Sequence, residues 1–484
     1  MLLRRFYDEG LAQASYLIGC QATGEALVVD PNRDIEQYIA AAEAESLRIV
    51  HVTETHIHAD FVSGSRELAQ RTRATLYLSD EGGPDWRYDY AVEAGAVLLK
   101  DGARLQMGKV AIEVLHTPGH TPEHLAFLVT DTPAASAPVG VLSGDFVFVG
   151  DVGRPDLLER AANYRGTMEH GARQLFQSLQ RFKRFPDYLQ IWPGHGAGSA
   201  CGKALGAMPQ STLGYERLAN WAFGIIEETP FVTAVLDGQP EPPKYFAEMK
   251  RINKEGPRLL GTLGRSRRLP AARAGALLAA GALIVDTRAA ADFAAGHIPG
   301  TINIPLNRAF TGWAGWLIPY DRDFYLLIDH AREDAVETAA RDLAMIGLDR
   351  LAGYLDCDDE MLETWRAAGG TIGFTPQMTV DQLHERLPAG GLTVIDVRGR
   401  AEWEAGHLPG VVHIPLGLLP DQLDQLPPPG PIVLQCQTGS RSAIAASLLT
   451  ARGRTDVFNL EGGFAAWQQA GYRVETERLA AAAR

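Results

Sequence analysis

A cysteine near the end of the chain occupies a position in which a thiol can act as a nucleophile. Cys436 follows the apolar, strand-like run PIVLQ, and the run AIAASLL further on predicts a helix. The polar loop between them consists of Gln437, Thr438, Gly439, Ser440, Arg441 and Ser442. Loop N–H groups, the positive end of the helix dipole and the charge of Arg441 all favour the thiolate. The same surroundings would stabilise a cysteine persulfide or an anion such as sulfite, so covalent catalysis by sulfur is predicted.

Other functions also place a cysteine in such a loop. A tyrosine-phosphatase-type loop and arsenate reduction are two of them, and a buried structural cysteine at a strand end is a third. Arg441 comes five positions after Cys436, one fewer than the phosphatase spacing Cys-x5-Arg requires. The shorter loop suits a small sulfur atom.

Histidines and aspartates recur after strand-like runs in the first half of the chain. They are His56, His58 and Asp60 in THIHAD, His120 in TPGHT, Asp145 in LSGD and His195 in WPGH. Loops at strand ends are where α/β proteins gather functional groups. Imidazole and carboxylate donors without thiolate are typical of zinc or ferrous iron sites. The pattern therefore predicts a metal site.

Composition limits the classes of protein to be considered. A length of 484 residues predicts two to four domains. The net charge of −14 argues against a nucleic-acid partner. Four cysteines in unlike contexts argue against a disulfide framework and favour a reducing compartment. The sequence shows no signal peptide and no long apolar run, so we expect a cytoplasmic protein without a membrane span.

The second half of the chain contains a repeat. ALIVDTRAAADFAAGHIPGTINIPL resembles LTVIDVRGRAEWEAGHLPGVVHIPL, with Asp286 opposite Asp396. Alternating strands and helices in each copy predict two α/β domains with parallel sheets. Asp329 stands opposite Cys436, so the first copy is predicted to be inactive, and Cys357 falls outside the loop and is interpreted as structural. The expected domains are residues 1–250, 262–370 and 375–478.

The last copy resembles a rhodanese, a thiosulfate sulfurtransferase. The resemblance rests on IDVRGRAEWEAGHLPGVVHIPL, CQTGSRS and VFNLEGGFAAWQQAG, which span the domain. It implies that Cys436 carries the persulfide and that Thr438, Gly439, Ser440 and Arg441 hold the anion.

Residues 1 to about 245 resemble the metallo-β-lactamase superfamily, in its glyoxalase II and persulfide dioxygenase branch. THIHAD, TPGHT, SGD and PGH carry the resemblance, which implies an αββα sandwich. Dinuclear hydrolases of this superfamily have His-x-His-x-Asp-His, but here Phe61 replaces the last histidine, which argues for a single metal. In the dioxygenase branch the ligands carry over to His56, His120 and Asp145, which would hold one Fe(II) per chain as a facial triad. His58, Asp60 and His195 would then orient these ligands.

Taken over its whole length, the chain resembles bacterial persulfide dioxygenase–rhodanese fusions. The resemblance implies oxidation of a glutathione or coenzyme A persulfide by O2 to sulfite, coupled to transfer of sulfane sulfur between persulfide, sulfite and thiosulfate in either direction. We also expect a homo-oligomer. Two alternatives stay open: a zinc-dependent glyoxalase II-like thioester hydrolase joined to a sulfurtransferase, and a non-enzymatic sulfur carrier.

Three further residues have two interpretations each. Cys201 is either a thiol that handles sulfur near the metal or a small buried residue in a Gly-rich turn. Arg154 either binds the anionic end of the substrate or forms an ion pair at the surface. Cys20, which follows an apolar run, is interpreted as structural.

Overall fold

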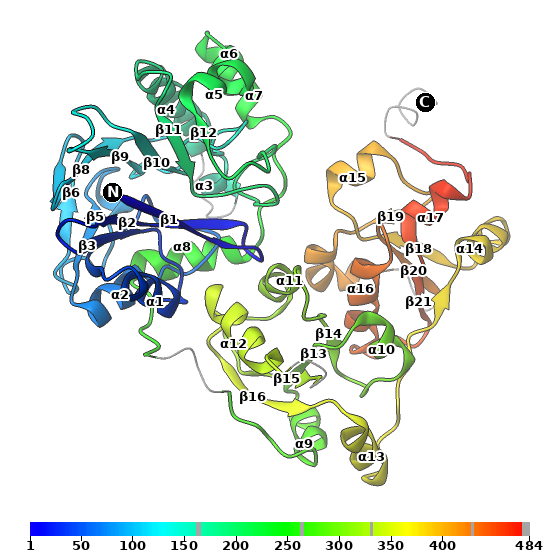
Figure 1. Ribbon diagram of the computed structural model, residues 1–484. Coiled ribbons are helices and arrows are strands. Elements are labelled where there is room, and N and C mark those ends of the chain that lie inside the picture. The colour runs from blue at the N-terminus through cyan, green and yellow to red at the C-terminus, as the bar shows by residue number, and fades with distance from the viewer. Residues whose placement is uncertain (161–165, 262–265, 330–332, 427–429, 477–484) are drawn as a thin grey trace. The chain divides into compact units, whose positions relative to one another are not determined.

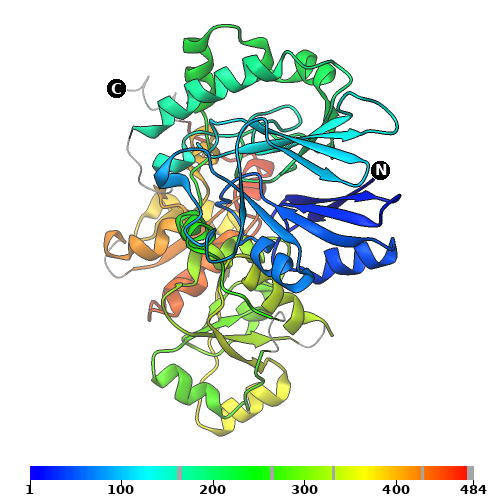
Figure 2. The ribbon, with the colours of Figure 1, turned by 90° about the vertical axis from the view of Figure 1, so that its left-hand side faces the viewer.

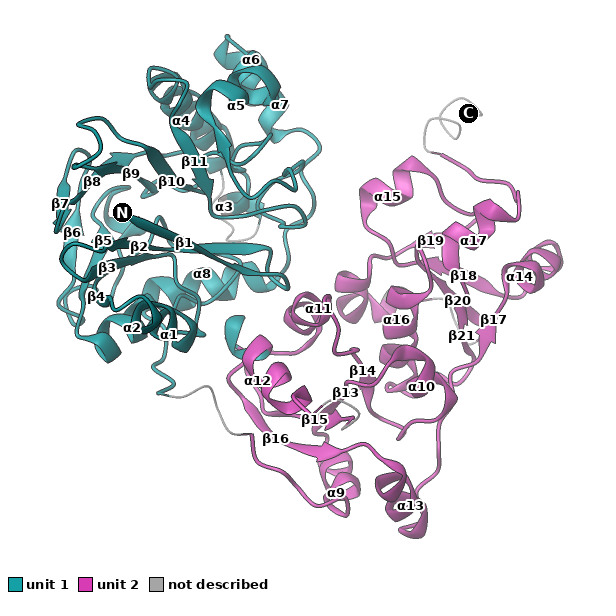
Figure 3. Ribbon diagram, viewed as in Figure 1, with its two compact units in different colours: residues 1–263, 343–347 teal, residues 264–342, 348–484 magenta. Residues whose placement is uncertain are grey.

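The structure is a computed structural model that describes residues 1–160, 166–261, 266–329, 333–426 and 430–476. The chain divides into two compact units, residues 1–263 with 343–347, and residues 264–342 with 348–484 (Figure 3). Within the described ranges, no helix is both long enough and apolar enough to cross a membrane.

Two six-stranded sheets form the N-terminal unit. In the first sheet the strands lie side by side in chain order: β1 (Leu2–Asp8), β2 (Gln13–Cys20), β3 (Glu25–Val29), β4 (Arg48–Thr53), β5 (Thr75–Ser79) and β6 (Val97–Leu99). The second sheet also follows chain order: β7 (Arg104–Met107), β8 (Val110–His116), β9 (Leu125–Asp131), β10 (Gly140–Gly144), β11 (Gln190–Pro193) and β12 (Ser211–Thr212). Both sheets mix parallel and antiparallel pairs.

The two sheets face each other across an apolar core and carry helices on their outer faces (Figures 1 and 2). The helices of this unit are α1 (Glu36–Ala44), α2 (Ser65–Thr72), α3 (Leu157–Arg160), α4 (Thr167–Phe182), α5 (Leu213–Ala219), α6 (Trp221–Gly224), α7 (Glu228–Leu236) and α8 (Tyr245–Glu255), with a 3₁₀ turn η1 (Pro84–Trp86). In α4, Leu175, Leu179 and Phe182 recur at helical spacing and bury one face against the second sheet. β2 is buried along its whole length because both of its faces are covered. The predicted αββα sandwich is confirmed.

The second unit contains two parallel sheets, one for each copy of the repeat. The first copy orders its strands β14-β13-β15-β16, which are β13 (Leu283–Asp286), β14 (Ile302–Asn303), β15 (Phe324–Ile328) and β16 (Leu351–Asp356). Its helices are α9 (Arg273–Ala279), α10 (Ala290–Ala295), α11 (Phe310–Leu317), α12 (Ala335–Met345) and α13 (Asp359–Ala367). All strand pairs of this sheet are parallel, as predicted.

The second copy repeats this topology and adds one strand, in the order β17-β21-β20-β18-β19. The strands are β17 (Gln377–Met378), β18 (Thr393–Asp396), β19 (Val412–His413), β20 (Ile432–Gln435) and β21 (Val457–Leu460). The helices are α14 (Val380–Arg386), α15 (Arg400–Ala405), α16 (Ser440–Thr450) and α17 (Gly463–Gln469), with 3₁₀ turns η2 (Leu387–Ala389), η3 (Leu416–Asp421) and η4 (Leu423–Gln425). β20 ends immediately before Cys436, and α16 begins four residues after it.

Helix α16 holds the two copies of the repeat together. Its residues from Ser442 to Leu449 are all buried, so the helix has no polar face along this stretch. It packs on β20 and β21 of its own sheet and on β14 of the other copy, where the Asn303 N–H donates a hydrogen bond of 2.9 Å to Ser447 Oγ. The first copy therefore covers the helix that follows the Cys436 loop, and the two copies form one compact unit.

The boundary predicted at residue 250 falls inside α8. Met249 and Asn253 of this helix are buried in the N-terminal unit.

Gly463 tests how closely the chain packs behind the Cys436 loop. Its φ is +56°, and a Cβ there would lie 2.2 Å from the Cys436 carbonyl oxygen, whereas Gly453, with φ +86°, has open space around it. The positive φ penalises alanine at both positions, but only Gly463→Ala adds overpacking. We expect Gly463→Ala to lower the free energy of unfolding by about 1–3 kcal/mol more than Gly453→Ala. Thermal unfolding measures this difference, and equal midpoints for the two variants would contradict the packing described.

Candidate functional site

Four strand ends in the N-terminal unit bring together the residues predicted to form a metal site. His56 comes shortly after β4, His120 after β8, Asp145 directly after β10 and His195 after β11. All four side chains are buried. Donor atoms of His56, His120 and Asp145 lie within 4.8 Å of one another. The structure therefore assembles the three residues to which the ligand role was assigned.

The imidazoles of this group are oriented by hydrogen bonds on their far sides. His56 Nδ1 bonds the Thr55 hydroxyl at 3.0 Å, and His120 Nδ1 bonds the Arg154 carbonyl oxygen at 3.2 Å. Their Nε2 atoms consequently face Asp145 Oδ2, at 4.0 Å from His56 and 3.5 Å from His120. Fixing one ring nitrogen in this way is how proteins aim the other at a metal.

The charge states of His120 and Asp145 suit a bound cation. Neither carboxylate oxygen of Asp145 accepts a hydrogen bond of ordinary geometry, although the side chain is fully buried. Burial raises the pKa of Asp145 to about 6 and lowers the pKa of His120 to about 3. The imidazole of His120 is therefore neutral at physiological pH, as a metal ligand must be. A buried carboxylate without donors beside neutral imidazoles is the arrangement that a bound metal ion would satisfy.

His58 lies beside this group but is held differently. Its Nε2 bonds Asp30 Oδ1 at 3.1 Å. Burial alone would lower the pKa of His58, but the Asp30 carboxylate outweighs burial and raises it to about 9. His58 is therefore a charged partner of Asp30, which fits the predicted supporting role better than a ligand role.

A second group of donors adjoins the first. One donor atom each from Asp60, His195 and Cys201 lies within 4.8 Å of the others. His195 Nε2 is 3.2 Å from Asp60 Oδ2 and 3.5 Å from Asp145 Oδ1. Burial and the Asp60 carboxylate raise the pKa of the Cys201 thiol well above its usual value. Cys201 thus lies beside the predicted metal ligands, where one of its two interpretations placed it.

Phe61 occupies the position of the missing histidine. It is fully buried, and its ring centroid lies 4.4 Å from that of His58. An apolar ring there offers no donor to a metal.

Two supporting residues escaped the sequence analysis. Asp30, at the end of the β3 run, accepts hydrogen bonds from the N–H of Thr55 at 2.6 Å and from its hydroxyl at 2.9 Å. Asn253 on α8 donates to the carbonyl oxygens of His58 at 2.8 Å and Phe61 at 2.7 Å. The strand-end position of Asp30 was a usable signal, but nothing near Asn253 in the sequence indicates its role.

The side chain of Arg154 makes structural contacts. Its guanidinium donates to both carboxylate oxygens of Asp156, at 2.9 and 2.7 Å, and to the carbonyl oxygens of Ala200 and Pro240. Its side chain is fully buried. This favours the ion-pair interpretation over binding of an anionic substrate, and the link of Arg154 to the site is its carbonyl oxygen, which orients His120.

The sulfur of Cys436 lies in a buried nest of donors. The Gly439 N–H donates to Sγ at 3.1 Å and the Ser442 hydroxyl at 3.4 Å. Gly439 has φ +98° at the N-terminus of α16, a conformation that favours glycine. The structure thus places the thiol between a strand end and a helix N-terminus, where the sequence predicted it.

The other residues of the Cys436 loop do not all point toward the sulfur. Arg441 does not point freely at the sulfur, because it forms two hydrogen bonds with Glu402 on α15, at 2.6 and 2.7 Å. Burial would raise the pKa of Glu402, but Arg441 outweighs it and lowers this pKa. Thr438 and Ser440 are exposed. Gln437 accepts a hydrogen bond of 3.4 Å from Arg398, a buried residue that the sequence analysis did not select.

The first copy of the repeat keeps the framework of the second. Arg288 pairs with Asp286 at 2.7 Å, and Arg398 pairs with Asp396 at 2.7 Å. In the position of Cys436 the first copy has Asp329, directly after β15. Cys357, after β16, lies in the apolar core of this copy.

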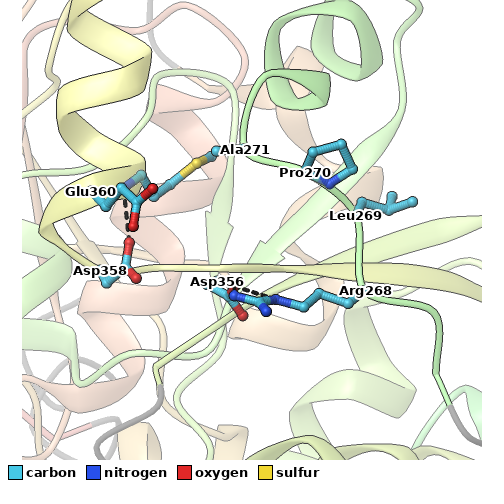
Figure 4. Close-up of a pocket in the computed structure, with 8 residues that line it drawn as sticks. Arg268, Leu269, Pro270, Ala271, Asp356, Asp358 and Glu360 are labelled. Carbon is cyan, nitrogen blue, oxygen red and sulfur yellow. Dashed lines mark hydrogen bonds and ion pairs between the residues drawn. The ribbon is translucent and has the colours of Figure 1, made fainter.

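A surface pocket of the first copy is lined by residues that include some near Cys357 in the sequence. Figure 4 shows its lining and the ion pair of Arg268 with Asp356. The lining residues are Arg268, Leu269, Pro270, Ala271, Asp356, Asp358, Glu360 and Met361. None of them is a predicted site residue.

The remaining cysteine, Cys20, ends β2 in the sandwich core, and its sulfur accepts a hydrogen bond of 3.2 Å from the Lys109 N–H.

Comparison with known families matches the two halves of the chain separately. Residues 8–195 match the model of the metallo-beta-lactamase superfamily. Residues 271–356 and 379–470 each match the model of the rhodanese-like domain.

Individual relatives cover different parts of the chain. A metallo-beta-lactamase of known structure from Staphylococcus aureus is 44% identical and has a TM-score of 0.65, with 74% of this chain and 99% of that chain covered. A hydroxyacylglutathione hydrolase of Rhodopseudomonas palustris is 30% identical over 241 residues, which are 49% of this chain and 80% of that protein. A mitochondrial persulfide dioxygenase of Bos taurus is 27% identical over 199 residues, 40% of this chain and 68% of that protein. The chain spans about three fifths of the length of several other curated relatives.

Cys357 provides a test of which cysteine carries sulfur. Burial raises its pKa to about 12, so almost no thiolate exists near neutral pH, and thiolate is the reactive form. We expect Cys357→Ser to keep the rate of sulfur transfer from thiosulfate to cyanide within about twofold, because a buried site away from the loop affects stability rather than chemistry. Complete loss of transfer in a folded Cys357→Ser protein would overturn the structural interpretation.

Proposed function

We propose that this chain, which belongs to the metallo-beta-lactamase superfamily and carries two rhodanese-like domains, oxidises a low-molecular-weight persulfide with dioxygen and transfers sulfane sulfur through Cys436. The observation that carries the proposal is the donor group of two oriented imidazoles and one buried carboxylate that accepts no hydrogen bond of ordinary geometry, formed by His56, His120 and Asp145. The similarity to the persulfide dioxygenase of Bos taurus and the two rhodanese-like domains support a role in sulfur metabolism.

The donor group fits a single ferrous ion. Two imidazoles and one carboxylate on one side of a metal form the facial triad of non-haem iron oxygenases, and iron bound there would supply activation of dioxygen and orientation of the persulfide sulfur. The contribution of the protein's other residues is to position the ligands. Thr55 and the Arg154 carbonyl fix the two rings. The segment that carries His56 is held by the contacts of Asp30 with Thr55 and His58 and by the hydrogen bond from Asn253 to the His58 carbonyl oxygen.

The reaction proposed for the first site balances without a further oxidant. One persulfide, one dioxygen and one water give one thiol, one sulfite and two protons. The outer sulfur loses four electrons, and dioxygen gains four. Glutathione persulfide and coenzyme A persulfide are both suitable substrates in this scheme.

The second site would use the product of the first. Cys436 accepts the outer sulfur of a persulfide, and the donor thiol leaves. Sulfite then attacks the outer sulfur of the Cys436 persulfide, which gives thiosulfate and restores the Cys436 thiolate. The N–H of Gly439 and the hydroxyl of Ser442 stabilise sulfur charge in both forms of the cysteine. The reverse direction, with persulfide made from thiosulfate, uses the same residues. Linking both sites in one chain raises the local concentration of sulfite.

A zinc-dependent thioester hydrolase is the second candidate, favoured by the similarity to hydroxyacylglutathione hydrolases. In the dinuclear arrangement a second metal draws on an additional imidazole. Phe61 takes the place of that imidazole here, which supports the dioxygenase over the hydrolase.

Removal of the carboxylate tests the first site. We expect anaerobically iron-loaded protein to consume oxygen with glutathione persulfide and to release sulfite. Asp145→Asn removes the anionic ligand, so iron affinity should fall by at least about tenfold, the smallest loss typical even of an outer-shell change. Oxygen electrode traces and iron analysis measure both effects. Protein that carries two zinc ions, hydrolyses a glutathione thioester and consumes no oxygen would contradict the proposal.

Replacement of the nucleophile tests the second site. Cys436→Ser cannot form a persulfide, so thiosulfate:cyanide transfer should fall by more than about 1,000-fold, as for other activated nucleophiles. Oxygen consumption with a persulfide should persist, because the dioxygenase residues are unchanged. Full transferase activity in this variant would remove Cys436 from the mechanism.

A further inference from the structure

The ion pair between Glu402 and Arg441 is not used by the proposed transfer of sulfur. Glu402 lies on α15, and its two carboxylate oxygens accept hydrogen bonds of 2.6 and 2.7 Å from the two terminal nitrogens of Arg441. One of these oxygens also accepts a hydrogen bond of 3.2 Å from the Gly399 N–H. A carboxylate held by two partners in this way has a fixed position beside the Cys436 loop.

Arg441 interacts electrostatically with both Glu402 and Cys436. It lies in the first turn of α16, five positions after Cys436. The hydrogen bond and the charge of Glu402 raise the pKa of Arg441, and the charge of Cys436 adds to this rise, although burial lowers it. The Glu402 carboxylate therefore compensates the positive charge that an anion at the sulfur would otherwise meet.

Arg398, a second arginine that contacts the Cys436 loop, is compensated as well. Its guanidinium donates to both carboxylate oxygens of Asp396, at 3.1 and 2.7 Å, and to the Gly406 carbonyl oxygen at 2.7 Å. This guanidinium thus faces a carboxylate of its own, as Arg441 faces Glu402.

The remaining donors at the sulfur carry no charge. They are the Gly439 N–H and the Ser442 hydroxyl. Residues 375–476 contain no lysine, and acidic residues outnumber arginines among them. In the described part of this domain, the surroundings of Cys436 therefore provide hydrogen bonds while the arginines at the loop are paired with carboxylates.

We propose that Glu402 determines which sulfur donors react at Cys436: paired with Arg441, it disfavours thiosulfate and favours the persulfide of a thiol. The inference rests on the function proposed for Cys436 and names the class of donor that this site prefers. Glu402 acts through the charge of Arg441, so it is a specificity-determining residue that does not touch the reacting atoms.

The two donors differ by one negative charge. Thiosulfate carries two charges, and a deprotonated persulfide carries one on its outer sulfur. With either donor the Cys436 thiolate attacks the outer sulfur, a new sulfur–sulfur bond forms, and sulfite or the thiolate leaves with the electron pair of the old bond. Three negative charges meet at Cys436 with thiosulfate and two with the persulfide, so a nearby carboxylate raises the barrier more for thiosulfate.

The same carboxylate affects the capture of sulfur by sulfite. Attack of sulfite on the Cys436 persulfide passes through the transition state of the thiosulfate reaction in reverse, so Glu402 slows both directions by the same factor. Exchange of sulfur between thiols is therefore favoured over exchange with oxyanions, and capture by sulfite depends on a high local concentration of sulfite.

Glu402→Gln tests this role, because glutamine keeps the size of the side chain and an oxygen for Arg441 but removes the charge. Sulfur transfer to cyanide is measured in the full-length protein with thiosulfate and with glutathione persulfide, and the rate without protein is subtracted. The ratio of kcat/KM for thiosulfate to kcat/KM for the persulfide should rise about tenfold. The rise is moderate because the Glu402 side chain is 39% exposed and water screens its charge.

The ratio separates specificity from folding, because both donors are assayed on the same sample and any unfolded fraction cancels. An unchanged or lower ratio in Glu402→Gln overturns the proposal. In particular, equal losses with both donors would show that Glu402 only supports the loop.

Glu404→Gln is the matched control. Glu404 lies on the same helix, pairs with Arg400 at 2.7 Å and is 40% exposed, close to the value for Glu402. The substitution removes the same charge from the chain but leaves the partner of Arg441 in place, so the ratio should stay within about twofold. An equal rise in Glu404→Gln would reveal a general effect of net charge and contradict the role of Glu402.

The outcome is separable from that of the proposed function. Wild-type protein that transfers sulfur from neither donor would refute the function of Cys436 and, with it, the role of Glu402. Transfer that depends on Cys436 but keeps its donor ratio in Glu402→Gln would refute only the role of Glu402.

Discussion

The N-terminal unit is organised around a buried negative charge. Asp145 has no exposed surface, and neither of its oxygens accepts a hydrogen bond of ordinary geometry. A carboxylate in that state costs several kcal/mol, roughly, unless a cation compensates it. Around it, the hydroxyl of Thr55 and the carbonyls of Ala12 and Arg154 each hold the far nitrogen of an imidazole, so that three rings turn their Nε2 atoms toward Asp145. The strand ends thus determine the shape of the pocket. The Asp145 carboxylate, which accepts no hydrogen bond of ordinary geometry, makes the pocket suited to a positively charged ligand.

In the last rhodanese-like domain, the surroundings of Cys436 favour a negative charge, whereas the pocket around Asp145 favours a cation. Its reactive atom receives hydrogen bonds, from the Gly439 N–H and the Ser442 hydroxyl, at the N-terminus of a helix buried on all sides. The loop arginine is shared with Glu402, so backbone and hydroxyl donors, more than a free guanidinium, surround the sulfur. One pocket of the chain is therefore suited to a cation and the other to sulfur that carries negative charge, as the proposed oxidation and transfer of sulfane sulfur would require.

The repeated domains show which features belong to the fold and which to the chemistry. Both copies keep the aspartate–arginine pair at the end of the equivalent strands β13 and β18. Both also stack a histidine on an aromatic ring, His297 on Phe293 at 3.9 Å and His407 on Trp403 at 4.0 Å. The loops differ in chemical type, and Asp329 stands where the second copy has Cys436. The first copy nevertheless covers α16, since Asn303 bonds Ser447 on that helix. A domain with an aspartate in the place of the cysteine thus still supports the helix that follows the Cys436 loop.

The sequence by itself determined the parts of this protein that are local in the chain. Strand-then-loop motifs identified His56, His120, Asp145 and Cys436, and the repeat predicted two parallel sheets, because each of these depends on neighbouring residues and on strand ends meeting at one sheet edge. The tertiary structure alone decided what depends on side-chain direction and distant partners. It paired Arg154 with Asp156 and Arg441 with Glu402, and brought Asn253 to the loop after His58. It also placed Cys201 against Asp60, a proximity that arises only when the two sheets of the sandwich pack face to face.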